Sequence, residues 1–594
     1  MIDRGLLDQA IAELGNNPEQ RDAIFEKGHC VVLAGPGSGK TKTLTIAMAR
    51  ALIEDVKEPR GIACITYNNE CAIELEERLA RLGIEASDSV FIGTVHSFAL
   101  SQVIAPYARC VLPELQPGFL VATREQCRQS VESAYQVAVG GDERPHQRWQ
   151  FAEDKRRRYV DRTLPAWEER TPELTRFIEA YEADLRRQNF IDFDDMPLLA
   201  FRMMQAHPWI QRSLWAKFPI LFVDEYQDLG HALHELVLKL CFESNIRLFA
   251  VGDLDQSIYG FTGANPELLR SIVDRDDVRD IHLRFNYRSG TKIIDASMAA
   301  LGEEREYVAA DGAAEGVIHF RGVDGYLDSL GEHLTASIIP DLQNREVSLE
   351  EIAVLYRNAE HGNYVAIAAL AANLPFVRSD KQALVKRNSR LSRWIEACSV
   401  WVTAGWKDAT PPFSRLLREA VLMVTGGGAS RDEIRRIEYE LITFLQSGIA
   451  QPHNANIWLK ALRAEVIKPW MLRSRTPDIE WNAIDEMIAQ TEPQAAHGNM
   501  SLAHFSGRIE GSGRLNLSTL HSAKGREFDA VILFAMNDDI IPTYGEQTNA
   551  RKLAEVRRLF YVGVTRARKE LYLLFSKGQH SPWVKDLYDR SHAS

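Results

Sequence analysis

A glycine-rich turn followed by lysine and threonine is the clearest chemical signal in this sequence. Residues 29–44 read HCVVLAGPGSGKTKTL, which is a short β-branched run, a turn and the start of an amphipathic segment. Backbone N–H groups of such a turn and of a helix N-terminus point at a bound anion, and glycines let the backbone approach it. Lys40 would hold the β- and γ-phosphates of a nucleotide, and the Thr41 hydroxyl would ligate Mg²⁺.

The turn meets the pattern GxxxxGK[ST] except that Ala34 stands at the first glycine position. The alternative is a turn between a strand and a helix with no ligand, but the strand-turn-helix context favours the nucleotide site. The residues predicted to line it are Ala34, Gly35, Pro36, Gly37, Ser38, Gly39, Lys40, Thr41 and Lys42.

A second chemical group follows the apolar run ILFV at residues 220–223, where the chain continues as Asp224-Glu225. In a nucleotide-hydrolysing site a carboxylate at the end of a neighbouring strand holds Mg²⁺, and an adjacent glutamate can deprotonate the attacking water. Asp224 is therefore the candidate metal ligand and Glu225 the candidate base. The alternative is an acidic N-capping turn.

A third group, GDLDQSIYGFTGA at residues 252–264, follows the apolar run RLFAVG. Asp253 and Gln256 would stand where a parallel strand ends, which is where ligands of such sheets bind, and Gln256 could donate to a γ-phosphate. Tyr259 and Phe261 suit base stacking worth about 1–3 kcal/mol per base. Equally, these two rings could be core residues.

Arginines follow later in the chain, with Arg288 in LRFNYRSG and both Arg566 and Arg568 after VRRLFYVGVT. Arginines supplied by a second domain commonly neutralise charge on a transferred phosphoryl group. The alternative is an ordinary salt-bridged surface role. Between them, LNLSTLHSAKGREFDAVIL places a polar segment with His521 between two predicted strands of a second α/β unit.

The elements that must position these groups are alternating strands and helices, which predicts an α/β fold with parallel sheets. At 594 residues the chain is long enough for roughly four domains.

The composition limits the possible partners and cofactors. A net charge of −12 means that any nucleic-acid contact depends on local basic residues. The seven cysteines form no CxxC pair, which argues against a zinc site and a disulfide framework. An N-terminus without an apolar h-region, and the lack of any apolar run of about 18 residues, predict a cytoplasmic protein with no membrane partner.

In order and across nearly the whole chain, these segments resemble the motifs of UvrD/Rep-type superfamily 1 DNA helicases. The matching segments are NPEQRDAI (17–24), AGPGSGKT (34–41), ITYNNECAIELEERL (65–79), GTVHSF (93–98), FVDEYQD (222–228), VGDLDQSIYGFTGA (251–264), NYRS (286–289), IAVLYRN (352–358), STLHSAKGREFD (518–529) and LFYVGVTRA (559–567).

The resemblance implies a role for each site residue, with ATP and Mg²⁺ as cofactors. Gln20 would read adenine, Tyr287 would stack on it, and Glu527 would join the nucleotide-binding set. Glu225, Gln256, Arg288 and Arg566 would be catalytic, and Thr41 and Asp224 would hold the metal. The residues expected to contact DNA are Tyr67, His96, Tyr259, Phe261, Arg357 and His521.

The same resemblance implies two RecA-like motor domains, each interrupted by a mostly helical insertion. The first motor would comprise 1–108 and 188–283, with an insertion at 109–187. The second would comprise 284–375 and 505–594, with a short insertion at 376–504. The basic run KRRR (155–158) in the first insertion is either a solvated helix face or a DNA contact.

The implied function is an ATP-dependent helicase that moves 3′ to 5′ on single-stranded or partially duplex DNA. Thr262 and Arg526 depart from the family pattern, which usually has arginine and leucine at these positions. These departures and the short second insertion motivate an alternative. It is a DNA-sensing ATPase subunit that gates a partner nuclease with little unwinding, as in Gabija-type anti-phage systems.

Overall fold

The computed structural model describes residues 4–15, 17–66, 69–84, 89–116, 118–140, 144–258, 265–380, 383–386, 389–405, 411–425, 429–449, 454–474, 481–495, 497–498, 500–506 and 513–592. The chain forms two compact units. Unit 1 comprises residues 1–317, 542–569 and 586–594, and unit 2 comprises residues 318–541 and 570–585.

A six-stranded sheet with the order β3-β2-β6-β7-β1-β8 forms the centre of unit 1. Its strands are β1 (His29–Ala34), β2 (Ile62–Thr66), β3 (Val90–Thr94), β6 (Ile220–Val223), β7 (Arg247–Gly252) and β8 (Val278–Leu283). Every neighbouring pair is parallel. The carboxyl ends of β1, β6 and β7 therefore meet at one edge of the sheet, which is the edge where the predicted site residues follow in sequence.

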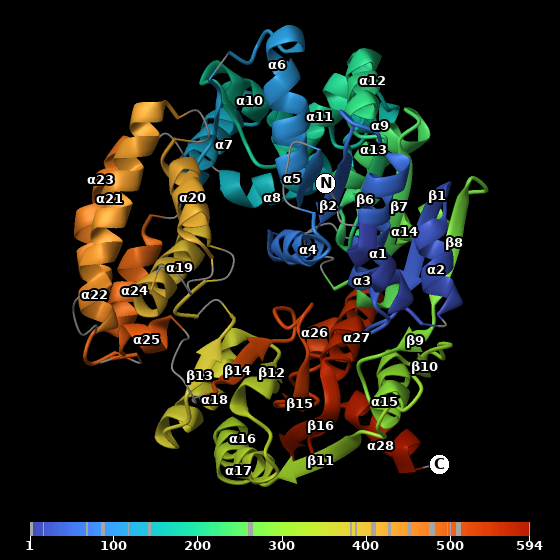
Figure 1. The fold of residues 1–594 in the computed structure, drawn as a ribbon, viewed down its shortest axis with the longest axis vertical. Coiled ribbons are helices and arrows are strands. Elements are labelled where there is room, and N and C mark those ends of the chain that lie inside the picture. The colour runs from blue at the N-terminus through green and yellow to red at the C-terminus, as the bar shows by residue number, and fades with distance from the viewer. Residues whose placement is uncertain are drawn as a thin grey trace. The chain divides into compact units, whose positions relative to one another are not determined.

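Helices cover both faces of this sheet because its strands are apolar on both sides. Successive residues of β1 alternate between faces, with Cys30 and Val32 in one core and Val31 in the other. The helices of the first face are α1 (Arg4–Ala12), α2 (Pro18–Phe25), α3 (Lys40–Arg50) and α4 (Asn69–Arg81) (Figure 1). The other face is covered by α5 (Val95–Phe98), α6 (Ala105–Val111), α11 (Asp195–Ala206), α12 (Pro208–Lys217), α13 (His231–Val237) and α14 (Pro266–Val273).

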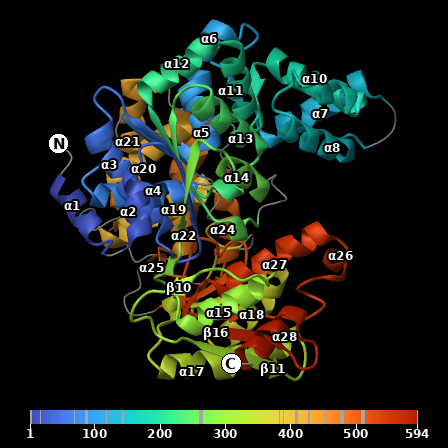
Figure 2. The same ribbon diagram turned by 90° about the vertical axis from the view of Figure 1, so that its right-hand side faces the viewer.

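Between α6 and α11 the chain forms a helical group with its own core. Its helices are α7 (Arg124–Ala138), α8 (Pro145–Arg158), α9 (Pro165–Glu169) and α10 (Pro172–Arg187). The core includes Tyr135, Trp167 and Phe177. Figure 2 shows α7, α8 and α10 side by side. The strands β4 (Leu120–Val121), before α7, and β5 (Phe190–Ile191), after α10, form a short parallel pair where the chain enters and leaves this group.

The rest of unit 1 comes from later in the chain. It contains β9 (Phe285–Asn286), α15 (Thr291–Leu301), β10 (Val308–Ala309), α26 (Tyr544–Gln547) and α27 (Ala550–Val564). Helices α15 and α27 pack against each other. The expected boundary between the motors at residue 283 therefore does not coincide with the edge of unit 1, and the expected domain division stays a prediction.

A second six-stranded sheet, with the order β11-β16-β15-β12-β14-β13, forms the centre of unit 2. Its strands are β11 (Val317–Val323), β12 (Ile352–Tyr356), β13 (Phe376–Arg378), β14 (Leu515–Thr519), β15 (Phe528–Leu533) and β16 (Ala567–Ser576). Helices α16 (Leu327–His333), α17 (Ile339–Asn344) and α18 (Ala359–Ala371) share a core with it, while α28 (Pro582–His592) follows β16. The two sheets flanked by helices confirm the predicted fold class.

Helices also fill the described part of the stretch between β13 and β14. They are α19 (Arg390–Ala404), α20 (Phe413–Thr425), α21 (Arg431–Ile449), α22 (Ala455–Leu462), α23 (Lys468–Arg473), α24 (Ala483–Thr491) and α25 (Leu502–Phe505). Their common core includes Trp394, Trp458 and Trp470. None of the described helices is long and apolar enough to cross a membrane.

Candidate functional site

The turn between β1 and α3 has the backbone shape of an anion cradle. Gly37 and Gly39 have φ angles of 71° and 82°, and Gly39 directly precedes the first residue of α3, Lys40. Glycine adopts these left-handed angles without steric cost. The Ser38 hydroxyl donates to the Gly35 carbonyl oxygen at 2.7 Å, which stabilises the turn. The amide groups at the start of α3 are thereby directed toward a bound phosphate.

The Lys40 ammonium lies between two carboxylates at this edge of the sheet. Its Nζ is 3.8 Å from Glu225 Oε1 and 3.7 Å from Asp253 Oδ2. Within the described structure this buried Nζ has no hydrogen-bond partner. Because buried ammonium groups are normally hydrogen-bonded, Lys40 has donors to spare for the oxygens of a phosphate. The site therefore fits a nucleoside triphosphate.

Asp224 and Glu225 follow β6 at the predicted position. The Asp224 N–H donates to the Ile65 carbonyl oxygen of β2 at 2.9 Å, and the Asp224 carboxylate accepts from the Glu225 N–H at 3.0 Å. Burial and the neighbouring Glu225 charge raise the pKa of Asp224 to about 7. Glu225 has a left-handed backbone with φ 49°, which a non-glycine residue adopts only when its surroundings enforce it.

These carboxylates also fit a magnesium ion. A divalent cation beside Asp224 would relieve the unfavourable burial of its charge. No group of three or more His, Cys, Asp or Glu side chains that could hold a metal occurs among the described residues. Mg²⁺ commonly takes only one or two protein carboxylates and completes its shell with phosphate oxygens and water. Thr41, the second residue of α3, and Asp224 suit that arrangement.

Gln227 joins the two strand ends, a role that was not predicted from the sequence. Its side-chain Nε2 donates to Glu225 Oε2, and its Oε1 accepts from the Asp253 N–H at 2.9 Å. Gln227 is fully buried. It therefore fixes the orientation of the candidate base relative to the end of β7. The signal was a glutamine two residues beyond a strand-terminal glutamate in VDEYQD.

Gln256 and the two predicted arginines are brought together with this group. Gln256 Nε2 donates to Asp253 Oδ2 at 2.5 Å, and Arg566 Nη2 donates to Gln256 Oε1 at 3.2 Å. Arg288 Nη1 donates to the Thr565 carbonyl oxygen at 3.4 Å. Arg566 is 1% exposed, so the alternative of a surface arginine is wrong for this residue. Polar contacts therefore run from Lys40 through Asp253 and Gln256 to Arg566.

The segment around Tyr287 lies against the same turn. The Tyr287 N–H donates to the Gly37 carbonyl oxygen at 2.8 Å, and its hydroxyl accepts from Asn17 Nδ2 at 2.8 Å. The ring is half exposed. Gln20 is buried and its Nε2 donates to the Ser38 carbonyl oxygen at 3.2 Å and to Thr43 Oγ1 at 3.1 Å. Contact of Gln20 or Tyr287 with adenine stays a prediction.

Two further predicted nucleotide-site residues are Lys42 and Glu527. The Lys42 ammonium is 3.7 Å from Glu13 Oε2, and both side chains are exposed. Glu527 belongs to unit 2 and directly precedes β15. A contact of Lys42 or Glu527 with the nucleotide stays a prediction.

His96, one of the residues expected to contact DNA, stacks on an aromatic residue that sequence reasoning missed. The rings of His96 and Phe193 lie 3.8 Å apart at an angle of 22°. Phe193 is 58% exposed, so one ring of the pair is open to a binding partner. Burial lowers the pKa of His96 to about 4, so the imidazole is neutral near pH 7. A neutral stacked pair with one exposed ring is suited to bind a base.

In unit 2, Arg357 and His521 lie close together. Burial, Arg357 and Lys524 lower the pKa of His521 to about 4. Arg526, which departs from the family pattern, donates to Ser379 Oγ at 3.0 Å and to Asn516 Oδ1 at 2.6 Å. Arg526 thereby ties the turn that carries His521 to β14 and to the end of β13. Tyr67, Tyr259, Phe261 and Thr262 lie outside the described residues.

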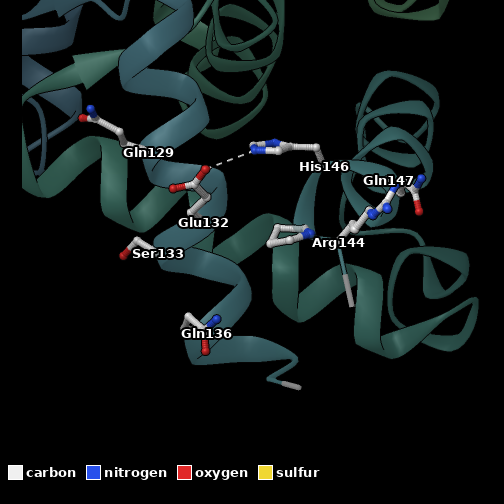
Figure 3. Close-up of a pocket in the computed structure, with 8 residues that line it drawn as sticks. Gln129, Glu132, Ser133, Gln136, Arg144, His146 and Gln147 are labelled. Carbon is white, nitrogen blue, oxygen red and sulfur yellow. Dashed lines mark hydrogen bonds and ion pairs between the residues drawn. The ribbon is translucent and has the colours of Figure 1, made fainter. Parts of the chain in front are cut away.

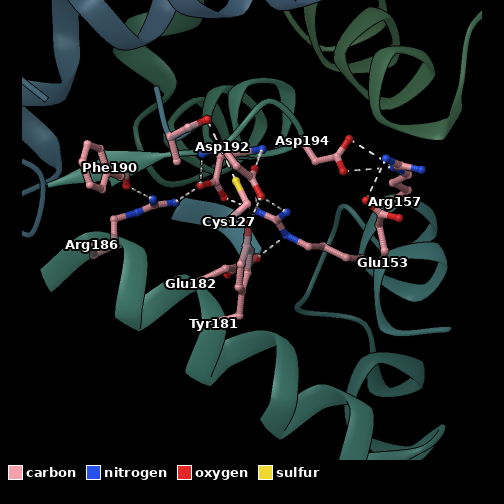
Figure 4. Close-up of polar contacts among 12 residues, drawn as sticks. Cys127, Glu153, Arg157, Tyr181, Glu182, Arg186, Phe190, Asp192 and Asp194 are labelled. Atoms are coloured by element: carbon pink, nitrogen blue, oxygen red, sulfur yellow. Dashed lines mark hydrogen bonds and ion pairs between the residues drawn. The ribbon is translucent and has the colours of Figure 1, made fainter. Parts of the chain in front are cut away.

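For the first two residues of the basic run at 155–158, both sequence interpretations, a solvated helix face and a DNA contact, are wrong. Lys155 and Arg156 are buried. Lys155 Nζ donates to the Trp167 carbonyl oxygen at 2.8 Å and to Thr175 Oγ1 at 2.5 Å. The Arg156 guanidinium pairs with Glu182, Asp192 and Asp195. Figure 4 shows the surrounding polar contacts, with Glu182, Asp192 and Arg186 among the labelled residues. These charges bind within the protein and are not available to DNA.

A shallow polar pocket lies between α7 and the start of α8 (Figure 3). Its volume is about 760 Å³, and its lining includes Gln129, Glu132, Ser133 and His146. His146 Nε2 lies 3.2 Å from Glu132 Oε1. The pocket contains none of the predicted site residues, so it is separate from the Lys40 site.

Comparison with known proteins agrees with this geometry. A family model described as the UvrD/REP helicase N-terminal domain matches residues 16–275, and one for the UvrD-like helicase C-terminal domain matches residues 483–578. The chain is 25% identical to the ATP-dependent DNA helicase PcrA of Leuconostoc citreum, over 98% of this chain and 83% of that protein. It is 24% identical to the ATP-dependent DNA helicase Rep of Salmonella typhimurium, over 94% of this chain and 90% of Rep.

A third relative is the ATP-dependent DNA helicase UvrD1 of Mycobacterium tuberculosis, which is 27% identical over 94% of this chain and 82% of UvrD1. The two family models describe the two halves of one type of enzyme, and together they match more than half of the chain. The three relatives match it along nearly its whole length. With the Lys40 site at the expected edge of the sheet, this chain belongs to the UvrD/Rep family of helicases.

Proposed function

We propose that this protein is an ATP-dependent DNA helicase that moves 3′ to 5′ along single-stranded DNA and displaces the complementary strand. The observation that carries the proposal is the continuous set of polar contacts from Lys40 through Asp253 and Gln256 to Arg566. It links the phosphate-binding turn to the residues that directly precede Tyr259 and Phe261. Hydrolysis of ATP and movement on DNA can thus be coupled over a few side chains.

Hydrolysis would use the chain's own groups as follows. The Glu225 carboxylate accepts a proton from a water molecule, whose oxygen forms a bond to the γ-phosphorus as the bond to the bridging oxygen of ADP breaks. Gln227 holds Glu225 in the orientation for that transfer. Lys40, Arg288 and Arg566 stabilise the charge on the transferring group. Mg²⁺, held by Thr41 and Asp224, would neutralise charge on the phosphate oxygens.

On the DNA side, the proposal assigns base contacts to the stacked pair His96 and Phe193 and polar contacts to Arg357 and His521. Tyr67, Tyr259 and Phe261 stay proposals from the family resemblance. The family also supplies the proposed division into motors, at 1–108 with 188–283 and at 284–375 with 505–594. The insertions of that division are 109–187 and 376–504.

The alternative function, a DNA-sensing ATPase subunit that gates a nuclease, gains no support from these relatives, which are named as helicases. The link to Gabija-type systems and to a partner nuclease therefore stays a hypothesis.

Strand displacement on tailed duplexes tests the proposal. A duplex with a 3′ single-stranded tail should be unwound when ATP is present, and a duplex with a 5′ tail of the same sequence should stay paired. Omission of ATP and the variant Glu225→Gln serve as controls, and both should leave the duplex intact. ATP hydrolysis that depends on DNA but separates neither duplex would favour the alternative.

A further inference from the structure

The segment between α15 and β10, residues 302–307, contacts the ATP site but has no role in the mechanism described above. It leads into β10, which pairs in parallel with β9, the strand that carries Asn286. Two of its side chains, Arg305 and Tyr307, reach different parts of the site. All of these residues belong to unit 1.

Arg305 forms a two-pronged ion pair with Asp255. Its Nε lies 2.7 Å from Asp255 Oδ2 and its Nη2 lies 2.8 Å from Asp255 Oδ1. The Asp255 side chain is 12% exposed and that of Arg305 is 30% exposed. Parallel hydrogen bonds between a guanidinium and a carboxylate fix orientation as well as distance. Glu303 holds Arg305 from the other side, with its Oε2 2.6 Å from Arg305 Nη2.

Asp255 stands between the Lys40 partner and the proposed γ-phosphate sensor. It is the middle residue of the single 3-10 turn Leu254–Gln256. Its N–H donates to Asp253 Oδ1 at 3.0 Å, and the Gln256 N–H donates to the Asp253 carbonyl oxygen at 3.2 Å. The turn is too short to let Asp255 move without Gln256. An ion pair that fixes Asp255 therefore fixes the backbone from which Gln256 projects.

The other end of this turn is held as well, since Arg558 Nε of α27 donates to the Ser257 carbonyl oxygen at 2.9 Å. Tyr307, two residues beyond Arg305, lies against the phosphate-binding turn. A Cβ atom added to Gly35 would be 2.4 Å from the Tyr307 ring. The same short segment thus contacts both the turn before Lys40 and the turn that carries Gln256.

We propose that Arg305 is a positioning residue of the ATPase, which acts through Asp255 to hold Gln256 where it meets the γ-phosphate. This inference rests on the proposed function. Arg305 acts through Asp255 and not by direct contact with the nucleotide. Its loss should therefore weaken stabilisation of the transferring phosphoryl group and leave binding of the rest of the nucleotide unchanged.

Steady-state ATPase kinetics of Arg305→Gln in the full-length protein with saturating oligo(dT) test the proposal. We expect kcat to fall about tenfold, because a small displacement of a positioned group has effects of this size or larger. The KM for ATP and the Kd for ADP should stay within about twofold. Affinity for ADP with aluminium fluoride, which mimics the transferring group, should fall by a factor similar to that for kcat.

Three variants make the result decisive. Arg305→Lys retains the charge but not the paired donors and should give an intermediate kcat. Asp255→Asn removes the other half of the pair and should reproduce Arg305→Gln, which keeps the test open if one variant folds poorly. Glu306→Gln breaks the exposed neighbouring pair with Arg284, 3.1 Å apart, and should match the wild type.

An unchanged kcat in Arg305→Gln and Asp255→Asn would overturn the inference. Equal losses of affinity for ADP and for ADP with aluminium fluoride would also overturn it, since they would indicate a structural role only. These outcomes are distinct from failure of the proposed function, in which the wild-type protein itself would show no ATPase stimulated by DNA.

Discussion

Lys40 and Glu225 have different tasks at the same site, and substitution should separate them. Lys40→Ala removes the ammonium group that would pair with the phosphates and leaves the carboxylates of Glu225 and Asp253, which repel them. Both ATP affinity and turnover should therefore be lost. Glu225→Gln retains the shape of the base but cannot accept a proton, so kcat should fall by about 10²–10⁴-fold. Nucleotide binding by Glu225→Gln, measured with a fluorescent ATP analogue, should persist. Wild-type turnover in Glu225→Gln would remove this residue from the mechanism.

Gln227 should matter to catalysis and not to ATP affinity. In Gln227→Glu the donor to Glu225 is lost and a second carboxylate is placed beside it, so we expect kcat to fall by about tenfold or more. The KM for ATP should change little. Gln211→Leu is the matched control, because Gln211 is also a buried glutamine and its side chain donates to the Met204 carbonyl oxygen of α11 at 2.9 Å. Its kcat should match the wild type, and an equal fall in both variants would mean a general loss of stability.

The low pKa of His96 in the folded protein predicts that the protein becomes less stable in acid. Burial lowers its pKa to about 4 in the folded protein, from an ordinary value near 6.5. Between these two values the unfolded chain binds more protons than the folded chain, so stability should decrease as the pH falls from about 6.5 toward 4. His96→Phe, which keeps a ring against Phe193, should show a smaller drop in Tm between pH 7.5 and pH 5 than the wild type. An identical drop in both proteins would contradict this prediction.

Among secondary-structure elements, the helices of the first insertion depend on one buried charge network. Arg156 on α8 pairs with Glu182 on α10 and with Asp192 and Asp195 at the start of α11. Arg156→Met would remove the cation that pairs with Asp192 and one of the cations that pair with Glu182 and Asp195. Removal of one partner of a buried ion pair typically costs about 3–5 kcal/mol. Hydrogen exchange in α8 and α10 should therefore become much faster.

Arg158→Met is the control for that experiment. Arg158 is 55% exposed and lies 2.9 Å from Asp154, also on the surface. Exposed pairs contribute roughly 0–1 kcal/mol, so exchange should hardly change. Similar exchange in the Arg156 and Arg158 variants would show that the buried network does not stabilise the insertion.

The strands and the phosphate-binding turn could be predicted because their signals are local. Apolar runs such as ILFV ended in Asp224 as expected, and the glycines before Lys40 adopt the angles that the motif requires. Phe193, Gln227 and Arg305 could not be found in this way. The role of each depends on a partner that folding brings near. A single aromatic, amide or guanidinium side chain in a sequence most often has an ordinary core or surface position. The basic run at 155–158 was misinterpreted for the same reason, since its acidic partners are distant in sequence.

Coupling between ATP hydrolysis and DNA is a property of the whole molecule. We expect ATP hydrolysis at the Lys40 site to respond to single-stranded DNA, because Gln256 is only a few residues from Tyr259 and Phe261, which are predicted to contact DNA. The family relationship and the geometry of unit 1 both lead to this expectation.

The most direct test is the rate of ATP hydrolysis by the full-length protein with and without single-stranded oligo(dT), at saturating ATP and Mg²⁺. We predict that DNA raises the turnover of the wild type many-fold, and that Glu225→Gln remains inactive in both conditions. Equal wild-type turnover with and without DNA would contradict the coupling of ATP hydrolysis to DNA.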